Sequence, residues 1–145
     1  MKSYAIAEEI FNSHFGSERT YKRSYCDYLT YTEGVMDFQE QLNAYWFVDN
    51  VISHMLKVLK SFKDNEFDFF VVEVRLNNNH QGYLEIYTEG YVNDEYNEHI
   101  SIVKQEIPYI DLPTKADTTV TSYKFYLELA SVEPVKFCLL LPREH

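Results

Sequence analysis

The change of hydrophobic period near residue 66 constrains this fold more than any other feature of the sequence. Before it, the stretch 44–62 repeats its apolar residues every three or four positions, the spacing of one helical face. The residues on that face are Ala44, Phe47, Val48, Val51, Ile52, Met55, Leu56, Leu59 and Phe62. From Phe67 the apolar residues alternate, as in half-buried strands. The sequence therefore predicts a helical part over 1–62 and a sheet part over 67–141.

Two shorter helices are expected before the long one. Ser3 is a suitable N-cap for a helix that continues to about Phe15 and ends at Gly16. Thr32 is the predicted N-cap of a second helix, EGVMDFQEQL, with an acid in its first turn. Asn43 is expected to separate this helix from the long one, although the two could also form one bent helix.

Five segments read as strands, because their apolar residues alternate or form short continuous runs. They are FDFFVVEVRL (67–76), YLEIYTEG (83–90), HISIVKQEI (99–107), SYKFYLEL (122–129) and VKFCLLL (135–141). Val103 breaks the alternation of the third segment, which suggests a bulge or a strand end. The segment GYVNDEYNE reads as a loop, and the prolines of IPYIDLP exclude a central strand there.

Short polar connections between these segments favour antiparallel pairing, since a parallel crossover needs a longer connection. The predicted fold class is α+β, with N-terminal helices packed on one face of a mostly antiparallel sheet of about five strands. Its 145 residues suit a single domain, 1–145.

The charge of the chain restricts its partners. With 13 Lys plus Arg against 23 Asp plus Glu, the formal net charge is −10. Such a charge opposes attraction to nucleic acid and to anionic membranes, and it favours basic protein surfaces. No segment is apolar enough to span a membrane, and the opening MKSYAIAEEIF is no signal peptide. We expect a cytoplasmic protein with Cys26 and Cys138 reduced.

Motifs of catalysis or cofactor binding are absent from the sequence. The five histidines form no HxH or HExxH pattern, and the four glycines form no phosphate-binding loop. The acids of the loop 89–98 lack the ligand spacing and the central glycine of an EF-hand. We therefore expect no catalytic residue, no metal site and no cofactor. An unrecognised hydrolase would need convergent carboxylates near His80 or His99.

Two surfaces are candidates for binding. The first is a basic and tyrosine-rich segment that could stack and neutralise single-stranded RNA, or whose tyrosines could simply pack beneath the helices. Its possible RNA-binding residues are Arg19, Tyr21, Lys22, Arg23 and Tyr25. The second is the outward face of the strands with the acidic loop. Its predicted partner-binding residues are Tyr83, Glu85, Tyr87, Glu89, Asp94, Glu95, Glu98, Lys124, Tyr126 and Glu128.

Tyrosines beside acids supply contact area and charge complementarity for a basic partner, although tyrosine is also common on any half-exposed strand.

Four blocks of the sequence carry a resemblance. They are YTEGV (31–35), AYWFVDNVIS (44–53), EIPYIDLP (106–113) and LLLPREH (139–145). In this order they resemble the YTDGV, AYWLLD, YTDFP and LLPSEY blocks of a small uncharacterised family of phage and mobile-element proteins. Ile110 and Leu112 stand where that pattern has threonine and phenylalanine. The resemblance implies a shared fold and brings no catalytic residues.

The mobile-element setting implies a role in the contest between phage and host. A small acidic protein without catalytic motifs is similar in character to anti-CRISPR inhibitors, which bind basic channels of RNA-guided nucleases. We therefore expect a non-enzymatic inhibitor or regulator of a host protein with a basic nucleic-acid-binding surface, such as an RNA-guided nuclease of the RNA-targeting type VI class. The alternatives are a direct RNA-binding protein and an unrecognised hydrolase.

Overall fold

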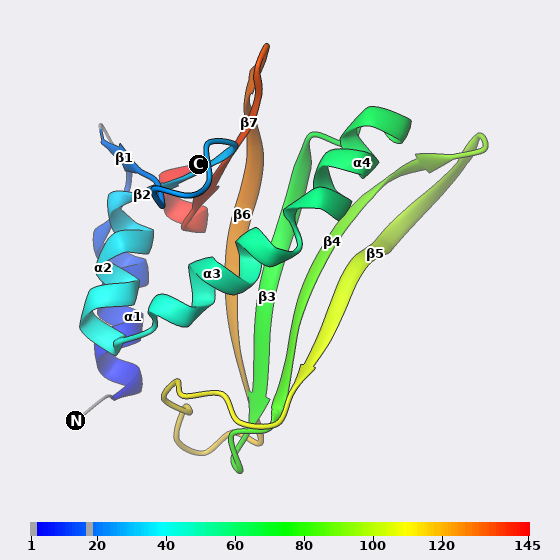
Figure 1. Cartoon of the computed structure of the whole chain (residues 1–145). Coiled ribbons are helices and arrows are strands. Elements are labelled where there is room, and N and C mark those ends of the chain that lie inside the picture. The colour runs from blue at the N-terminus through cyan, green and yellow to red at the C-terminus, as the bar shows by residue number, and fades with distance from the viewer. Residues whose placement is uncertain (1–2, 17–18) are drawn as a thin grey trace.

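One mixed sheet organises the computed structural model, which describes residues 3–16 and 19–145. Its strands are β1 (Thr20–Tyr21), β2 (Leu29–Thr32), β3 (Phe69–Asn77), β4 (Gly82–Val92), β5 (Glu95–Ile107), β6 (Val120–Val132) and β7 (Val135–Leu140). Within the described part, seven strands lie in the order β1-β2-β7-β6-β3-β4-β5, and only β2 and β7 pair in parallel (Figure 1). The α+β class is confirmed.

The sheet is mostly antiparallel, as predicted, but the described chain has two strands beyond the five expected, because β1 and β2 come from the tyrosine-rich segment. β2 has four residues, too few to show a period in the sequence. Its identity depends on β7, with Leu29 opposite Phe137 and Tyr31 opposite Leu139. This parallel pair joins two segments that are far apart in the chain, and short-range patterns do not reveal such pairings.

Helices α1 (Tyr4–Ser13), α2 (Glu33–Leu42), α3 (Tyr45–Ser53) and α4 (Met55–Asn65) precede β3, and a short 3₁₀ helix, η1 (Pro142–Glu144), follows β7. Figure 1 shows α3 and α4 crossing one face of the sheet. Rings from three helices converge on Phe125 of β6, at centroid distances of 5.3 Å for Phe11, 5.0 Å for Phe38 and 4.3 Å for Phe47. This aromatic cluster ties α1, α2 and α3 to the sheet.

The long helix predicted over 44–62 is two helices, divided at His54. The His54 amide donates to Val51 O at 3.0 Å, a tight i−3 bond that ends α3. The His54 imidazole lies 2.7 Å from Gln105 Oε1 of β5, which fixes the junction against the sheet. The division also changes the buried face: Leu56, placed on that face by its spacing, is 73% exposed.

Helix α2 has the predicted bounds, and its caps explain why. Thr32 Oγ1 accepts a hydrogen bond from the Val35 amide at 3.4 Å, and Asn43 ends the helix in the left-handed region at φ 51°. Helix α1 ends earlier than expected, at Ser13, and the side chain of Ser3 makes no capping bond. The His14 imidazole, just past α1, lies 3.1 Å from Asp37 on α2 and connects the two helices.

Most of the apolar residues that alternation places inward are buried, including Phe70, Val72 and Val74 on β3, whereas Ile100, Ile102 and Leu129 are half-buried. The expected loop over 90–98 is wrong, because these residues form the two arms and the turn of the β4–β5 hairpin. Asn93 and Asp94 form the turn with φ of 53° and 66°, a geometry that Asn and Asp tolerate. The bulge suggested near Val103 is confirmed: Ile86 pairs with Val103 and Tyr87 with Ser101, which leaves Ile102 without a partner.

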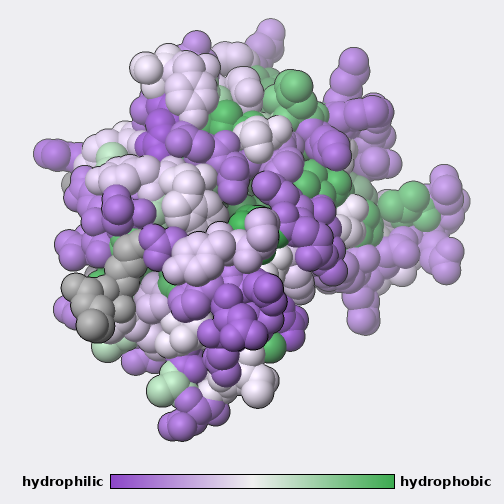
Figure 2. Space-filling model, turned by 60° about the horizontal axis from the view of Figure 1, so that its bottom comes forward, coloured by the Kyte–Doolittle hydropathy of each residue, from purple (hydrophilic) through white to green (hydrophobic). Residues whose placement is uncertain are grey.

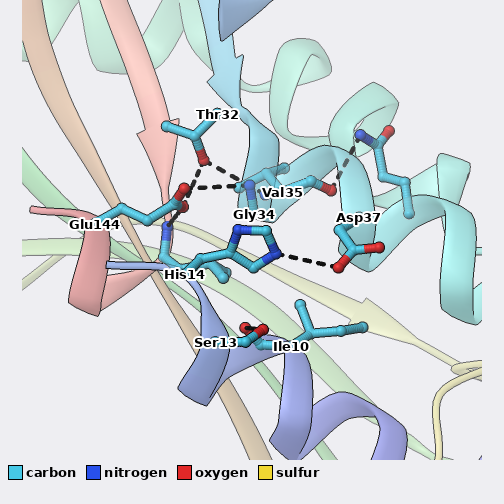
Figure 3. A network of polar contacts seen from close by, with 10 residues as sticks. Ile10, Ser13, His14, Thr32, Gly34, Val35, Asp37 and Glu144 are labelled. Atoms are coloured by element: carbon cyan, nitrogen blue, oxygen red, sulfur yellow. Dashed lines mark hydrogen bonds and ion pairs between the residues drawn. The ribbon is translucent and has the colours of Figure 1, made fainter. Parts of the chain in front are cut away.

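The buried carboxylate of Glu144 joins the C-terminal segment to the start of α2 (Figure 3). Glu144 Oε1 accepts from Thr32 Oγ1 at 2.6 Å and from the Leu141 amide at 2.9 Å, and Oε2 accepts from the Gly34 amide at 3.2 Å. A carboxylate at a helix N-terminus is stabilised by the free amides and the helix dipole. The blocks 31–35 and 139–145 therefore meet in a structural contact.

Candidate protein-binding face

The register of the sheet gathers predicted contact residues on the face opposite α3 and α4. Because Phe70, Val72 and Val74 point toward the core, the odd-numbered residues of β3 point the other way. Cross-strand pairing then defines an open face that consists of Phe69, Val71, Glu73, Arg75, Tyr83, Glu85, Tyr87, Lys104, Glu106, Ser122, Lys124, Tyr126 and Glu128.

Six residues predicted from the sequence belong to the open face: Tyr83, Glu85, Tyr87, Lys124, Tyr126 and Glu128. The other four, Glu89, Asp94, Glu95 and Glu98, are exposed on the β4–β5 hairpin. This hairpin extends beyond the end of α4 in the upper right of Figure 1. The two sets are thus continuous along β4.

A row of four charged residues crosses the middle of the open face in the order Lys124, Glu73, Glu85, Lys104. Glu73 and Glu85 are direct partners on β3 and β4, and each is only 7% exposed. Like charges opposite each other are destabilising unless neighbours compensate them. Here each carboxylate has a polar partner, Ser122 for Glu73 and His99 for Glu85.

The polar contacts of this row hold it in place. Ser122 Oγ donates to Glu73 Oε2 at 2.6 Å, and His99 Nε2 lies 3.1 Å from Glu85 Oε2. The His99 ring also stacks on Tyr87 at a centroid distance of 4.2 Å. Burial raises the pKa of Tyr87, and the nearby Glu73 and Glu85 carboxylates raise the pKa further. Tyr87 therefore keeps a neutral hydroxyl at neutral pH.

A hollow of about 390 Å³ lies where the open face meets the hairpin, and we call it the acidic hollow. It is lined by Glu66, Phe67, Asp68, Phe69, Val71, Tyr87, Thr88, Glu89 and Glu98. Four of these residues are acidic and none is basic, and the rest are mainly apolar or aromatic. No ion pair among the residues that the structure describes involves these four carboxylates.

The backbone around the acidic hollow is held by hydrogen bonds. Glu66 ends α4 in the left-handed region, and its amide donates to Phe62 O at 2.8 Å. Thr88 Oγ1 donates to Phe69 O at 2.6 Å, which links β4 to the start of β3. Tyr96 Oη donates to Glu89 Oε2 at 2.5 Å and orients that carboxylate. The hollow is therefore built on strands and a helix end.

Basic groups of the open face lie away from the acidic hollow. Arg75 is opposite Tyr83, and both lysines flank the central glutamates. Toward the hollow, Phe69 is opposite Glu128, whose Oε2 is 2.7 Å from the His145 imidazole. The open face thus has two halves. The charge-balanced half surrounds Glu73 and Glu85, and the acidic half contains Glu128 and adjoins the acidic hollow. Sequence reasoning missed this polarity, because Glu66 falls between the predicted helical part, 1–62, and the predicted sheet part, 67–141.

The basic and tyrosine-rich segment is engaged within the protein. The Arg23 guanidinium donates to Asp49 Oδ1 at 3.0 Å, Tyr31 Oη at 2.7 Å and Gln39 Oε1 at 2.6 Å. Tyr25 Oη donates to Asp49, Lys22 donates to Asp27, and Tyr21 stacks on Tyr31. Arg19, the fifth candidate, also has an interaction partner. This arrangement favours the interpretation that the segment packs and anchors, over RNA binding.

No group of three or more His, Cys, Asp or Glu side chains in the described chain is placed to hold a metal ion, and this includes the acids of the hollow. Cys26 is buried, and burial raises the pKa of the Cys138 thiol. The helices of residues 3–16 and 19–145 are all too short or too polar to cross a membrane. Figure 2 shows one end of the molecule, where hydrophilic residues dominate and hydrophobic ones form small separate patches.

A model for a family of unknown function (DUF6876) matches residues 5–145. The chain belongs to this family. Comparison of the chain with the curated proteins and with the solved structures found no match. The DUF6876 match begins one residue after the start of α1 and includes every described strand, so the open face and the acidic hollow both lie within the family region.

Proposed function

We propose that this DUF6876 protein is a non-enzymatic binding protein that regulates or inhibits a partner by occupying a basic surface. The observation that carries the proposal is the polarity of the open face, whose acidic half joins the acidic hollow and the acidic β4–β5 hairpin. Charge of one sign on one end of a face steers association with a partner of the opposite sign.

Aromatic side chains make this face suitable for contact. Tyr83, Tyr87 and Tyr126 are half-buried on the open face. Tyr91 and Tyr96 are exposed on the hairpin, and the centroids of their rings are 5.1 Å apart. Rigid tyrosines beside charged groups are typical of protein-binding surfaces, because they bury area with little loss of side-chain entropy.

The partner that fits best is a protein with a basic nucleic-acid-binding groove, because the net charge of −10 opposes binding to the nucleic acid itself. The channel of an RNA-guided nuclease is a groove of this kind. An inhibitor from a mobile element would act by covering such a channel before guide or target enters.

The experiment is a binding titration of the purified protein against RNA-guided nucleases, type VI effectors included, with and without guide RNA. We expect association with the guide-free effector, competition by guide RNA, and weaker binding at about 150 mM salt than at low salt. Association that guide RNA leaves unchanged, or no association with any such effector at low salt, would refute the proposal.

Matched charge-reversal variants locate the interface. The test variant combines Glu89→Lys, Glu95→Lys and Glu98→Lys, all exposed on the hairpin. The control combines Glu8→Lys, Glu9→Lys and Glu40→Lys, all exposed on α1 and α2. Both change the net charge equally, yet only the first should weaken binding, by about tenfold or more. Equal loss in both variants would indicate general charge attraction without a defined surface.

A further inference from the structure

We propose that the acidic hollow receives an arginine side chain of the partner. This inference rests on the proposed function, since it names the group that the acidic half of the face would bind. It begins from the shape of the hollow, whose volume of about 390 Å³ lies at the small end of ligand-binding pockets and is large enough to admit a long side chain.

The lining of the hollow matches both parts of an arginine side chain. Phe69, Val71 and Tyr87 give an apolar floor for the aliphatic stem, and Glu66, Asp68, Glu89 and Glu98 supply carboxylates for the cationic head. The lining holds no basic residue, and no ion pair of the described chain involves its four carboxylates, which are exposed. A cation bound at this position would therefore meet carboxylates and no competing positive charge in the lining.

Arginine fits better than lysine because the floor is aromatic. A planar guanidinium can stack on a ring and pair with carboxylates in the same plane, whereas an ammonium is a strongly hydrated point charge. The two rings are already positioned: Phe69 packs edge-on against Tyr126 at 4.9 Å, and Tyr87 stacks on His99 at 4.2 Å. Little ordering of the floor would therefore be needed on binding.

The test is an NMR titration of the isotope-labelled protein with N-acetyl-arginine amide. N-acetyl-citrulline amide is the control probe, because it has nearly the same shape and no charge. We expect arginine to shift the amide signals of Phe69, Val71, Tyr87, Thr88, Glu89 and Glu98. Citrulline should leave them in place, and the lysine derivative should bind several-fold more weakly. Magnesium chloride at equal ionic strength should also leave the signals unchanged.

The variant Glu89→Gln/Glu98→Gln should weaken the arginine response about tenfold, and Glu9→Gln/Glu40→Gln on α1 and α2 should not. Equal shifts with citrulline or magnesium, shifts confined to other residues, or none at saturating probe would each overturn the inference. Partner binding without an arginine response would reject only the hollow as an arginine site. An arginine response without any partner binding would reject the proposed function.

Discussion

The carboxylate of Glu144 occupies the space that a side chain at position 34 would need. A Cβ added at Gly34 would lie 2.5 Å from Glu144 Oε1 and 2.7 Å from Leu141 Cδ1. Gly34 is therefore required by the contact between α2 and the C-terminal segment, whereas its backbone conformation is ordinary helix.

Gly34→Ala should destabilise the protein by about 2 kcal/mol, although alanine is the better helix former, because the clash and the displaced carboxylate outweigh the gain in propensity. Urea unfolding measures the change. Gly16→Ala is the control, since nothing lies within 4 Å of the added Cβ there. If Gly34→Ala and the control were equally stable, the C-terminal segment with Glu144 would be able to move aside without loss of folding free energy.

Arg23→Lys should destabilise the fold, by roughly 2 kcal/mol. A lysine cannot reach Asp49, Tyr31 and Gln39 together, and Gln39 is fully buried, so its Oε1 would lose its partner. Lys22→Ala, which removes an exposed pair with Asp27, should hardly move the midpoint of urea unfolding. An equal effect of the two substitutions would contradict the anchoring role of Arg23.

The isolated protein should not bind single-stranded RNA. The basic groups at 22–23 already have partners within the chain, and the net charge of −10 repels a phosphate backbone. Fluorescence anisotropy of a short labelled oligouridine at low salt is the measurement. Saturable binding that Arg19→Ala or Lys22→Ala weakens would revive the RNA-binding alternative.

Asp49 should contribute to stability at neutral pH and lose that contribution in acid. Burial alone raises the pKa of Asp49, but hydrogen bonds from Tyr25 and Arg23 outweigh it and hold the pKa below its ordinary value of 3.8. A lowered native pKa gives stability that is present above the ordinary value and is lost as pH falls through the native value.

Unfolding midpoints of the wild-type protein and Asp49→Asn, measured from neutral pH to below pH 3.8, test this expectation. The difference between the two proteins should be largest at neutral pH and should shrink in acid. Asp27→Asn is a useful comparison, because the Lys22 hydrogen bond and charge also lower the pKa of Asp27 at a separate, exposed site. A difference independent of pH would show that Asp49 acts only by packing.

The sequence predicted those elements whose signals are local. Thr32 and Asn43 defined α2, and the alternation of Phe70, Val72 and Val74 defined the inward face of β3. The break at His54 depends on contacts with Gln105 of a distant strand, and the pairing of β2 depends on β7. The helical spacing of apolar residues continues through His54, so it does not reveal the break. The four residues of β2 are too few to show a strand pattern.

The candidate site was partly predictable for the same reason. The alternation of side chains along each strand placed Glu85 and Tyr126 outward. Only the register between β3 and β4 shows that Glu73 lies beside Glu85. The acidic hollow combines Glu66 at a helix end, Phe69 on β3 and Glu98 on β5. No sequence spacing connects three such positions, so a charge count alone could not separate the balanced half of the face from the acidic half.

The parallel pairing of β2 with β7 has a consequence for the order in which the protein folds. Thr32 and Glu144, which close this part of the structure, are 112 positions apart. During synthesis, the partners of β2 and of the start of α2 exist only after residues 135–144 have left the ribosome. Contacts of such long sequence separation slow folding. A nascent chain that lacks residues 135–144 would leave Leu29 and Tyr31 without their β7 partners and open to chaperones.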